Sequence, residues 1–193
     1  MKTDRLNSED CLLLLRIARE AIECAVNGKE LPKLELSAYP QRLQDQGASF
    51  VTLTLDGNLR GCIGALQASQ PLAQDVQEHA VAAALEDYRF RPVQPQEVAG
   101  LVIEISRLSP SQELEYFSPQ DLLLKLRPEV DGVVLRRGFQ RATFLPQVWE
   151  NIKDPSDFLT QLCYKMGVPG DLWLKEHLQV QIYQVQEFKE GDQ

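Results

Sequence analysis

The sequence has few of the residues and spacings that usually identify a metal, nucleotide or hydrolase site. It contains only two histidines in 193 residues, and no two of its four cysteines are spaced as Cys-x-x-Cys. Zinc sites are typically built from such closely spaced pairs, so none is expected here. No phosphate-binding loop, dinucleotide-binding fingerprint or Ser-His-Asp arrangement is present either. We therefore predict neither a metal nor a cofactor.

Positive charge is also scarce. Lysine and arginine total 20 against 28 aspartate and glutamate residues, which gives a net charge of −8. Nucleic-acid binding and docking to anionic membranes both depend on a basic surface, so neither is expected for the chain as a whole. A local basic cluster of Arg136, Arg137 and Arg141 is the exception.

Long hydrophobic runs are missing as well. The apolar run at residues 12–17 follows acidic residues and is interrupted by Arg16, so we expect neither a signal peptide nor a membrane span there. Without a secretory signal, reduced thiols are the expected state of the cysteines. We predict a cytoplasmic protein, and the sequence does not determine its oligomeric state.

The hydrophobic pattern predicts a single domain over residues 1–193 that combines helices with strands. Apolar stripes at helical spacing predict helices over 8–27 and about 69–87, the second with Pro71 in its first turn. Further helices are expected from residue 118 and over 155–166, with a helical turn at 171–175. Strands are predicted at 50–55, 59–66, 101–108, 133–137, 141–145 and 179–188. This order predicts an α+β fold with a mixed, largely antiparallel sheet flanked by helices.

The strand at residues 59–66, Leu-Arg-Gly-Cys-Ile-Gly-Ala-Leu, differs from the others because it contains two glycines, Gly61 and Gly64. Asp-Gly-Asn precedes it and is a turn signal, so this strand and the one at 50–55 are predicted to form a β-hairpin. Glycine weakens a strand. Two glycines around Cys62 therefore predict a bulge or a close approach to the backbone, and we assign both to the candidate site.

Cys62 is the only cysteine in such a backbone setting. In a regular strand Arg60 and Cys62 share one face and lie about 7 Å apart along it, and a guanidinium there favours the reactive thiolate. Two alternatives stay open at this point. Cys62 is also compatible with a buried, inert thiol, and Arg60 with a solvated or ion-paired side chain.

The same stretch, Leu-Arg-Gly-Cys-Ile-Gly after Phe-Val-Thr-Leu, resembles the signature of the AMMECR1 domain family, which includes the AmmeMemoRadiSam system protein A. Residues 86–92 resemble the family's Asp-x-Arg-Phe-x-Pro segment, and residues 142–148 its late Thr-x-Leu-Pro motif. The order and spacing match over nearly the whole chain. Ala65 and Asp131 depart from the family, where threonine and histidine are frequent, so no hydroxyl or imidazole role is carried over to them.

The resemblance implies a larger and a smaller lobe, interleaved along the chain, with a cleft between them. Glu78 matches a glutamate that recurs in the family and is predicted to be a catalytic acid or base, the alternative being a polar residue on an exposed helix face. Asp87 and Arg89 lie in a proline-bounded loop, where an arginine can clamp a carboxylate or phosphate, unless the pair only fastens the loop. Thr143 offers a hydroxyl to a pocket, unless it is packed as an ordinary strand residue.

Two functions follow from these residues. The first is an enzyme or enzyme subunit with a small-substrate pocket. Cys62 lies at the floor of that pocket, and around it are Arg60, Glu78, Asp87 and Arg89. The second is a non-catalytic binding or adaptor module that uses the Leu-Arg-Gly-Cys-Ile-Gly surface. Family members in microbes often occur beside Memo-like proteins and radical SAM enzymes, so the resemblance implies these as partners in a modification pathway. The substrate and the reaction are not named by the sequence.

Overall fold

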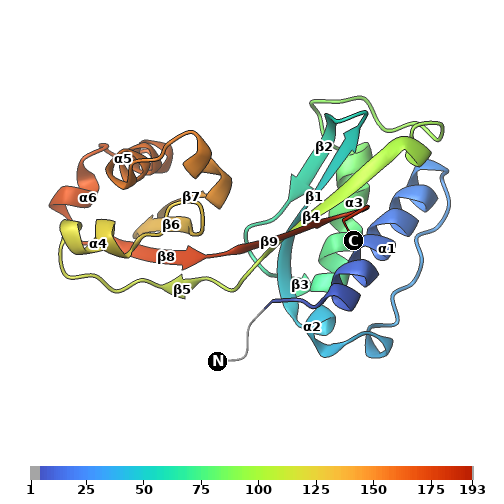
Figure 1. The fold of residues 1–193 in the computed structure, drawn as a ribbon, viewed down its shortest axis with the longest axis horizontal. Coiled ribbons are helices and arrows are strands. Elements are labelled where there is room, and N and C mark those ends of the chain that lie inside the picture. The colour runs from blue at the N-terminus through green and yellow to red at the C-terminus, as the bar shows by residue number, and fades with distance from the viewer. Residues whose placement is uncertain (1–4, 193) are drawn as a thin grey trace. The chain divides into compact units, whose positions relative to one another are not determined.

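The computed structural model describes residues 5–192, which divide into two compact units (Figure 1). The first unit combines the described residues up to Ser109 with those from Gln186 onward, and the second is the continuous segment Pro110–Val185. The second unit is thus inserted into the chain of the first. Each unit has its own hydrophobic core.

The first unit is built on a five-stranded sheet with the order β2-β1-β4-β9, in which the short β3 also pairs with β1. β1 runs antiparallel to β2, β3 and β4. The elements are α1 Ser8–Val26, η1 Leu36–Ala38, α2 Gln41–Gln44, β1 Gln46–Leu55, β2 Asn58–Gly64, β3 Gln70–Pro71, α3 Leu72–Leu85, η2 Val98–Gly100, β4 Leu101–Leu108 and β9 Val185–Lys189.

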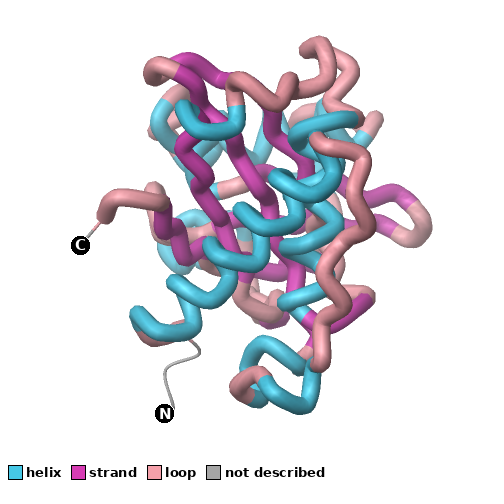
Figure 2. Tube along the Cα trace, turned by 90° about the vertical axis from the view of Figure 1, so that its right-hand side faces the viewer, coloured by secondary structure: helices cyan, strands magenta, loops and turns pink. Residues whose placement is uncertain are grey.

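Helices α1 and α3 cover one face of this sheet, as Figures 1 and 2 show. Side chains alternate along a strand, so Val51, Leu53 and Ile103 point toward the helices and are fully buried. Leu14 of α1 belongs to the same core. The intervening positions point to the opposite face, where side chains such as Thr52 stay only half-buried. The sheet therefore has one packed face and one open face.

The hairpin of β1 and β2 contains a bulge at Arg60. Leu53 pairs with Gly61, but the next residue, Thr54, pairs with Leu59, so Arg60 has no partner of its own in β1. An extra residue in one strand bends it and re-aims the side chain at that position. The predicted hairpin is confirmed. The bulge that the two glycines indicated lies at Arg60, the residue before Gly61.

Both glycines also permit a close approach, as predicted. A Cβ added to Gly61 would lie 2.1 Å from the carbonyl oxygen of Ala83 in α3. One added to Gly64 would lie 2.4 Å from the ring of Phe50. β2 therefore packs against the backbone of α3 at a distance that leaves no room for a side chain at position 61.

The second unit contains a four-stranded antiparallel sheet with the order β5-β8-β6-β7. Trp149 and Phe158 stack in its core with ring centroids 3.7 Å apart. Its elements are β5 Gln112–Glu113, α4 Pro119–Lys125, β6 Gly132–Arg137, β7 Gln140–Phe144, η3 Pro146–Glu150, α5 Pro155–Met166, α6 Leu172–Lys175 and β8 Gln179–Tyr183.

Asp131, at the position where the family often has histidine, is a structural residue of the second unit. Its side chain is fully buried, and its carboxylate accepts hydrogen bonds from the backbone N–H and the guanidinium of Arg127. Its carbonyl accepts a bond from Nε1 of Trp149 at 2.7 Å. These bonds fix the turn that leads into β6.

The predicted α+β class is confirmed, whereas the single strand predicted over 179–188 is wrong. The chain forms two strands there, β8 in the second unit's sheet and β9 in the first unit's sheet, with Gln184 between them. The alternating apolar pattern over residues 179–188 therefore belongs to strands of two different sheets. The helix α3 starts at Leu72, because Pro71 is extended and pairs with Gln46 instead of opening the first turn.

The four cysteines are not joined by disulfides in the structure, and their reduced state stays a prediction. Cys163 is buried, and the other three are partly exposed. None of the helices within residues 5–192 combines the length and the apolar character that crossing a membrane requires.

Candidate functional site

The sulfur of Cys62 lies on the open face of the first unit's sheet. The missing side chain of Gly61 faces α3, so alternation along β2 turns the side chain of Cys62 to the other face. Cys62 stands opposite Thr52 of β1, and Thr52 Oγ1 donates a hydrogen bond to Sγ at 3.2 Å. A hydroxyl donor at this position stabilises negative charge on the sulfur.

The peptide groups of Cys62 are held from outside the sheet by Asp87 and Arg89. β2 is an edge strand, so its outward N–H and C=O groups have no partner strand. Oδ2 of Asp87 accepts a bond from the N–H of Cys62 at 2.9 Å, and Nη2 of Arg89 donates to the carbonyl of Cys62 at 3.1 Å. The two side chains replace the missing strand and fix the backbone that carries the thiol.

Asp87 and Arg89 also bind each other. Nε and Nη2 of Arg89 donate to the two carboxylate oxygens of Asp87 at 2.9 and 2.6 Å, and Asp87 is buried. These bonds hold the pKa of Asp87 well below its ordinary value, against the opposing effect of burial, and the bond from the N–H of Cys62 lowers it further. Asp87 in turn raises the pKa of the Arg89 guanidinium. Both groups are therefore charged across the ordinary pH range.

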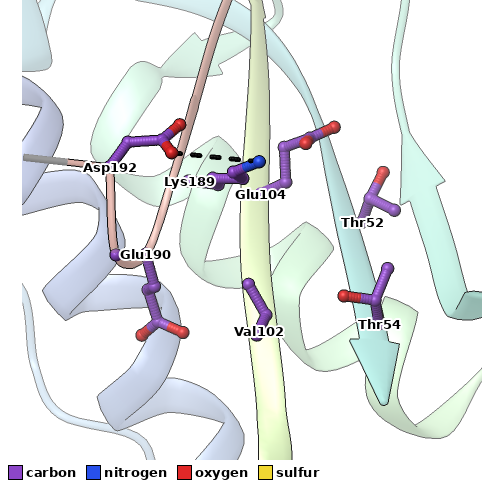
Figure 3. Close-up of a pocket in the computed structure, with 8 residues that line it drawn as sticks. Thr52, Thr54, Val102, Glu104, Lys189, Glu190 and Asp192 are labelled. Atoms are coloured by element: carbon purple, nitrogen blue, oxygen red, sulfur yellow. Dashed lines mark ion pairs between the residues drawn. The ribbon is translucent and has the colours of Figure 1, made fainter. Parts of the chain in front are cut away.

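A hollow of about 440 Å³ opens on the same face of the sheet, beside Thr52 (Figure 3). Lys189 and Asp192 form an ion pair there with a separation of 3.8 Å, and Glu190 is bound by Arg19. The hollow is lined by residues of β1 and β4 and by the chain around the end of β9, namely Thr52, Thr54, Val102, Glu104, Lys189, Glu190, Gly191 and Asp192.

Glu104 is the carboxyl group of this hollow that has no hydrogen bond or ion pair with another residue in the described range 5–192. Its side chain extends from β4 toward Thr52 (Figure 3). Burial raises the pKa of the Glu104 carboxyl, and the charge of Glu187 raises it further, whereas Lys189 lowers it. A carboxyl group with a raised pKa is better matched to accepting and returning a proton near neutral pH.

Cys62, Thr52 and Glu104 form a row across three neighbouring strands. Thr52 stands opposite Cys62 on one side and opposite Glu104 on the other. Strands lie about 4.8 Å apart, so the row places the carboxylate-bearing strand about 10 Å from the thiol-bearing strand, with the Thr52 hydroxyl between them. The sequence analysis missed Thr52 and Glu104. The only local signal was a carboxylate within an alternating apolar strand.

Arg60 does not lie beside the sulfur, because the bulge directs it elsewhere. Its Nε and Nη2 donate to the two oxygens of Glu97 at 2.8 and 3.0 Å, and its Nη1 donates to the carbonyl of Arg91 at 2.8 Å. The guanidinium that is bonded to Cys62 is that of Arg89. Arg60 thus fastens the loop after α3 to β2.

Glu78 is exposed on α3, where its Oε2 accepts a hydrogen bond from Nε2 of Gln70 at 2.6 Å. Because α3 packs on the helix-covered face of the sheet, the sheet lies between Glu78 and the sulfur of Cys62. The two residues are therefore not brought together in the first unit. The role of Glu78 as an acid or base stays a prediction.

Thr143 belongs to the second unit and is buried there. Its hydroxyl shares a hydrogen bond of 3.1 Å with the hydroxyl of Tyr183, which also donates to the carbonyl of Phe144 at 3.2 Å. Burial raises the pKa of Tyr183, and its bond with Thr143 opposes that rise. The hydroxyl of Thr143 is thus satisfied within its own unit, and a binding role for it stays a prediction.

Ser49, Asp75 and His79 form a second polar cluster, between β1 and α3. Oδ2 of Asp75 accepts a bond from Oγ of Ser49 at 2.6 Å and contacts Nδ1 of His79 at 3.1 Å. Ser49 and His79 both contact the same oxygen of Asp75, whereas in a hydrolase triad the histidine stands between the serine and the aspartate. Ser49 is also fully buried, so the cluster is not such a triad. Within residues 5–192, no group of three or more metal-binding side chains is arranged to hold an ion.

Comparison with known proteins places this arrangement in a family. The chain matches the family model described as AMMECR1 over residues 15–188. Protein MJ0810 of Methanocaldococcus jannaschii is 35% identical over 188 residues, which cover 96% of this chain and 92% of that protein. A protein of Methanothermobacter thermautotrophicus is 37% identical over 195 residues, covering 98% and 99%.

A solved structure has the same fold. The crystal structure of uncharacterized protein PH0010 from Pyrococcus horikoshii matches with a TM-score of 0.79 and 33% sequence identity. The match covers 96% of this chain and 94% of that one. None of these names states an activity, so the function has to be argued from the site itself.

Proposed function

The chain belongs to the AMMECR1 family, and on that premise we propose that it is a thiol-dependent enzyme acting on a small molecule held in the hollow beside Thr52. The observation that supports this most directly is the hydrogen bond from Thr52 to the sulfur of Cys62 on the open face of the sheet. The same threonine lines the hollow. Thr52 therefore stands between the thiol and a space for a small molecule, although Cys62 itself does not line that space.

In this proposal Thr52 connects the thiol to a proton acceptor. Cys62 gives its proton to the hydroxyl oxygen of Thr52, which passes its own proton through a water molecule in the hollow to the carboxylate of Glu104 in the next strand. After this transfer the hydroxyl of Thr52 donates to the sulfur, and the separation of 3.2 Å between Oγ1 and Sγ suits that bond. The raised pKa of Glu104 supports its use as the acceptor, because the carboxyl holds the proton more readily than an ordinary glutamate.

The sulfur then forms a bond with an electrophilic carbon of the substrate. The bond between that carbon and its leaving group breaks, and the leaving group departs with the proton that Glu104 returns. In a second step water adds its oxygen to the same carbon, and the sulfur–carbon bond breaks. One proton of the water restores the Cys62 thiol through Thr52, so the enzyme returns to its starting state.

Alkylation with iodoacetamide tests the reactivity of Cys62, because the thiolate is the form that reacts. We expect Cys62 to react about tenfold faster than the partly exposed Cys24 of the same molecule, which serves as the internal reference. Thr52→Val removes the hydroxyl donor, and we expect a loss of roughly tenfold in the rate at Cys62. Thr54→Val is the matched control, because Thr54 lines the same hollow without contacting the sulfur.

Peptide mass spectrometry separates the four thiols, so both rates come from one sample. A Cys62 that reacts no faster than Cys24 removes the nucleophile from the proposal. Equal effects of Thr52→Val and Thr54→Val would instead show that the hydrogen bond to sulfur has no special role.

A second candidate function is a binding or adaptor role, and Tyr88 is the observation that favours it. Its side chain is 94% exposed, although its neighbours Asp87 and Arg89 are fixed to each other and to Cys62. An exposed tyrosine between two residues that are themselves fixed is typical of the anchors that dominate protein interfaces. We propose a Memo-like protein or a radical SAM enzyme as the partner, as the family resemblance implies.

A pull-down with a purified Memo-like protein tests this second function. Tyr88→Ala is expected to abolish capture, and Phe139→Ala, which changes a fully exposed aromatic of the second unit, serves as the control. Undiminished capture by the Tyr88→Ala variant, or no capture by the unmodified chain, counts against the adaptor role of this surface.

A further inference from the structure

Arg89 presents a fixed guanidinium group beside the residue that carries the thiol. Its Nε and Nη2 are occupied by the carboxylate of Asp87 and the carbonyl of Cys62. Its Nη1 has no acceptor within residues 5–192, and 44% of the side chain is exposed. An arginine held in this way has already lost much of its conformational freedom, so a further hydrogen bond to it costs little entropy.

The other arginines near this edge strand differ from Arg89 in their rigidity or in the number of guanidinium nitrogens that are free to bind a ligand. Arg60 uses all three of its nitrogens within the protein, on Glu97 and on the carbonyl of Arg91. Arg91 is exposed, and no bond to a described residue fixes its side chain. Arg89 is therefore the guanidinium that is both rigid and still able to donate outward.

Arg89 also keeps its positive charge across the ordinary pH range. It donates hydrogen bonds to Asp87, and these are the chief reason why the pKa of its guanidinium is raised. A fixed cation here attracts negative charge on a molecule bound beside Cys62.

We propose that the substrate of Cys62 carries an anionic group, a carboxylate or a phosphate, which Nη1 of Arg89 binds. This inference rests on the thiol chemistry proposed above and adds the class of substrate to it. The anion joins Asp87 on the guanidinium and does not displace it, because Asp87 is bound by Nε and Nη2. The bound molecule then extends from Arg89 across the sulfur of Cys62 to Thr52 and the hollow.

Two alkylating reagents of nearly equal size but different charge test this inference. Iodoacetate carries a carboxylate, whereas iodoacetamide is neutral, and both react with the same thiolate. The ratio of their rates at one cysteine therefore cancels the fraction of thiolate and reports attraction for the anion. We expect the ratio at Cys62 to exceed the ratio for free cysteine by about tenfold, the value of one charge-assisted hydrogen bond.

Arg89→Gln is expected to reduce the ratio at Cys62 to that of free cysteine. Because this change leaves the buried Asp87 without its cation, the double variant Asp87→Asn with Arg89→Gln provides a second, neutral form of the pair. Arg137→Gln is the matched control, since it removes one exposed, ion-paired arginine of the second unit. It should leave the ratio unchanged.

The outcomes separate this inference from the proposed function. Rapid reaction of Cys62 with both reagents at the ratio of free cysteine overturns the anionic substrate and leaves the thiol chemistry standing. Slow reaction with both reagents overturns the thiol chemistry and this inference with it. A raised ratio that persists in both Arg89 variants also overturns the inference, because another group would then be attracting the anion.

Discussion

The β1–β2 hairpin of the first unit and the β6–β7 hairpin of the second have the same construction and different surroundings. Each is closed by a two-residue turn, Asp56-Gly57 in the first and Gly138-Phe139 in the second. Both residues of the first turn have positive φ, as in a type I′ turn, and only Gly138 has it in the second, as in type II′. Each hairpin also carries a hydroxyl or thiol residue that the sequence marked as a site candidate.

The surroundings decide what those candidates can do. In the first hairpin, side chains from other segments bind the backbone of Cys62, and its sulfur and Thr52 face an open surface with a hollow. In the second, the hydroxyl of Thr143 is enclosed with that of Tyr183. A reactive residue type in a hairpin strand therefore indicates a site only when one face of the strand stays open.

The largest effect should come from Gly61→Ala. A Cβ there would lie 2.1 Å from a backbone oxygen of α3, which cannot move without shifting the helix, so we expect a loss of about 3 kcal/mol in the free energy of unfolding. Gly138→Ala, in the turn of the other hairpin, meets no atom within 4 Å and should cost only about 1 kcal/mol for its positive φ. Urea denaturation measures both. Equal losses would show that the close packing of β2 on α3 is not what position 61 requires.

Asp87→Ala should have the next largest effect. It removes bonds to the guanidinium of Arg89 and to the N–H of Cys62, so we expect a loss of about 2 kcal/mol in stability and a change in the alkylation rate of Cys62. The counterpart in the second unit is Glu176→Ala, which breaks an exposed pair with Arg137 and should cost less than about 1 kcal/mol. If Asp87→Ala leaves the alkylation rate of Cys62 unchanged, then the bonds of Asp87 and Arg89 to the Cys62 backbone do not affect the reactivity of the thiol.

Thr143→Val tests the second hairpin of the comparison, in which the candidate hydroxyl is buried. The valine keeps the shape and removes one buried hydrogen bond, while the hydroxyl of Tyr183 keeps its bond to the carbonyl of Phe144. We expect a loss of about 1 kcal/mol in the free energy of unfolding and no change in Cys62 alkylation. A slower reaction at Cys62 in this variant would connect Thr143 to the candidate site after all.

Glu104→Gln should have the smallest effect on stability, and the size of that effect depends on pH. The pKa of Glu104 is raised in the folded protein, so its ionised form disfavours folding at any pH above the ordinary glutamate pKa of about 4.3. The glutamine variant should therefore be slightly more stable than the unmodified protein near neutral pH and should not differ from it below about pH 4. Urea denaturation at pH 3.5 and pH 7.5 measures this difference, and a variant less stable at pH 7.5 would contradict the raised pKa.

Local sequence signals predicted the elements that depend on neighbouring residues. Asp56-Gly57 between two alternating segments is a strong hairpin signal, and Ser118 caps α4 at the residue from which a helix was expected. The position of the bulge at Arg60 was not accessible in this way, because it depends on how β2 meets β1 and α3. The break at Gln184 was missed for a similar reason, since one alternating pattern continues through two strands of different sheets.

The candidate site was predicted only in part. Cys62, Asp87 and Arg89 were identified from their motifs, and the structure brings them together through the backbone of Cys62. Thr52 and Glu104 were missed, because their proximity to the thiol follows from strand register, which a single sequence does not reveal. The full set of site residues in the first unit could therefore be identified only from the tertiary structure.

Competition among the four thiols for a limiting amount of iodoacetamide at pH 7 tests the central claim most directly. The open, hydrogen-bonded sulfur of Cys62 should take most of the label, ahead of Cys24 and Cys11, while the buried Cys163 stays unlabelled. Labelling of Cys24 or Cys11 before Cys62 would contradict the claim that the open face of the sheet carries a reactive thiol.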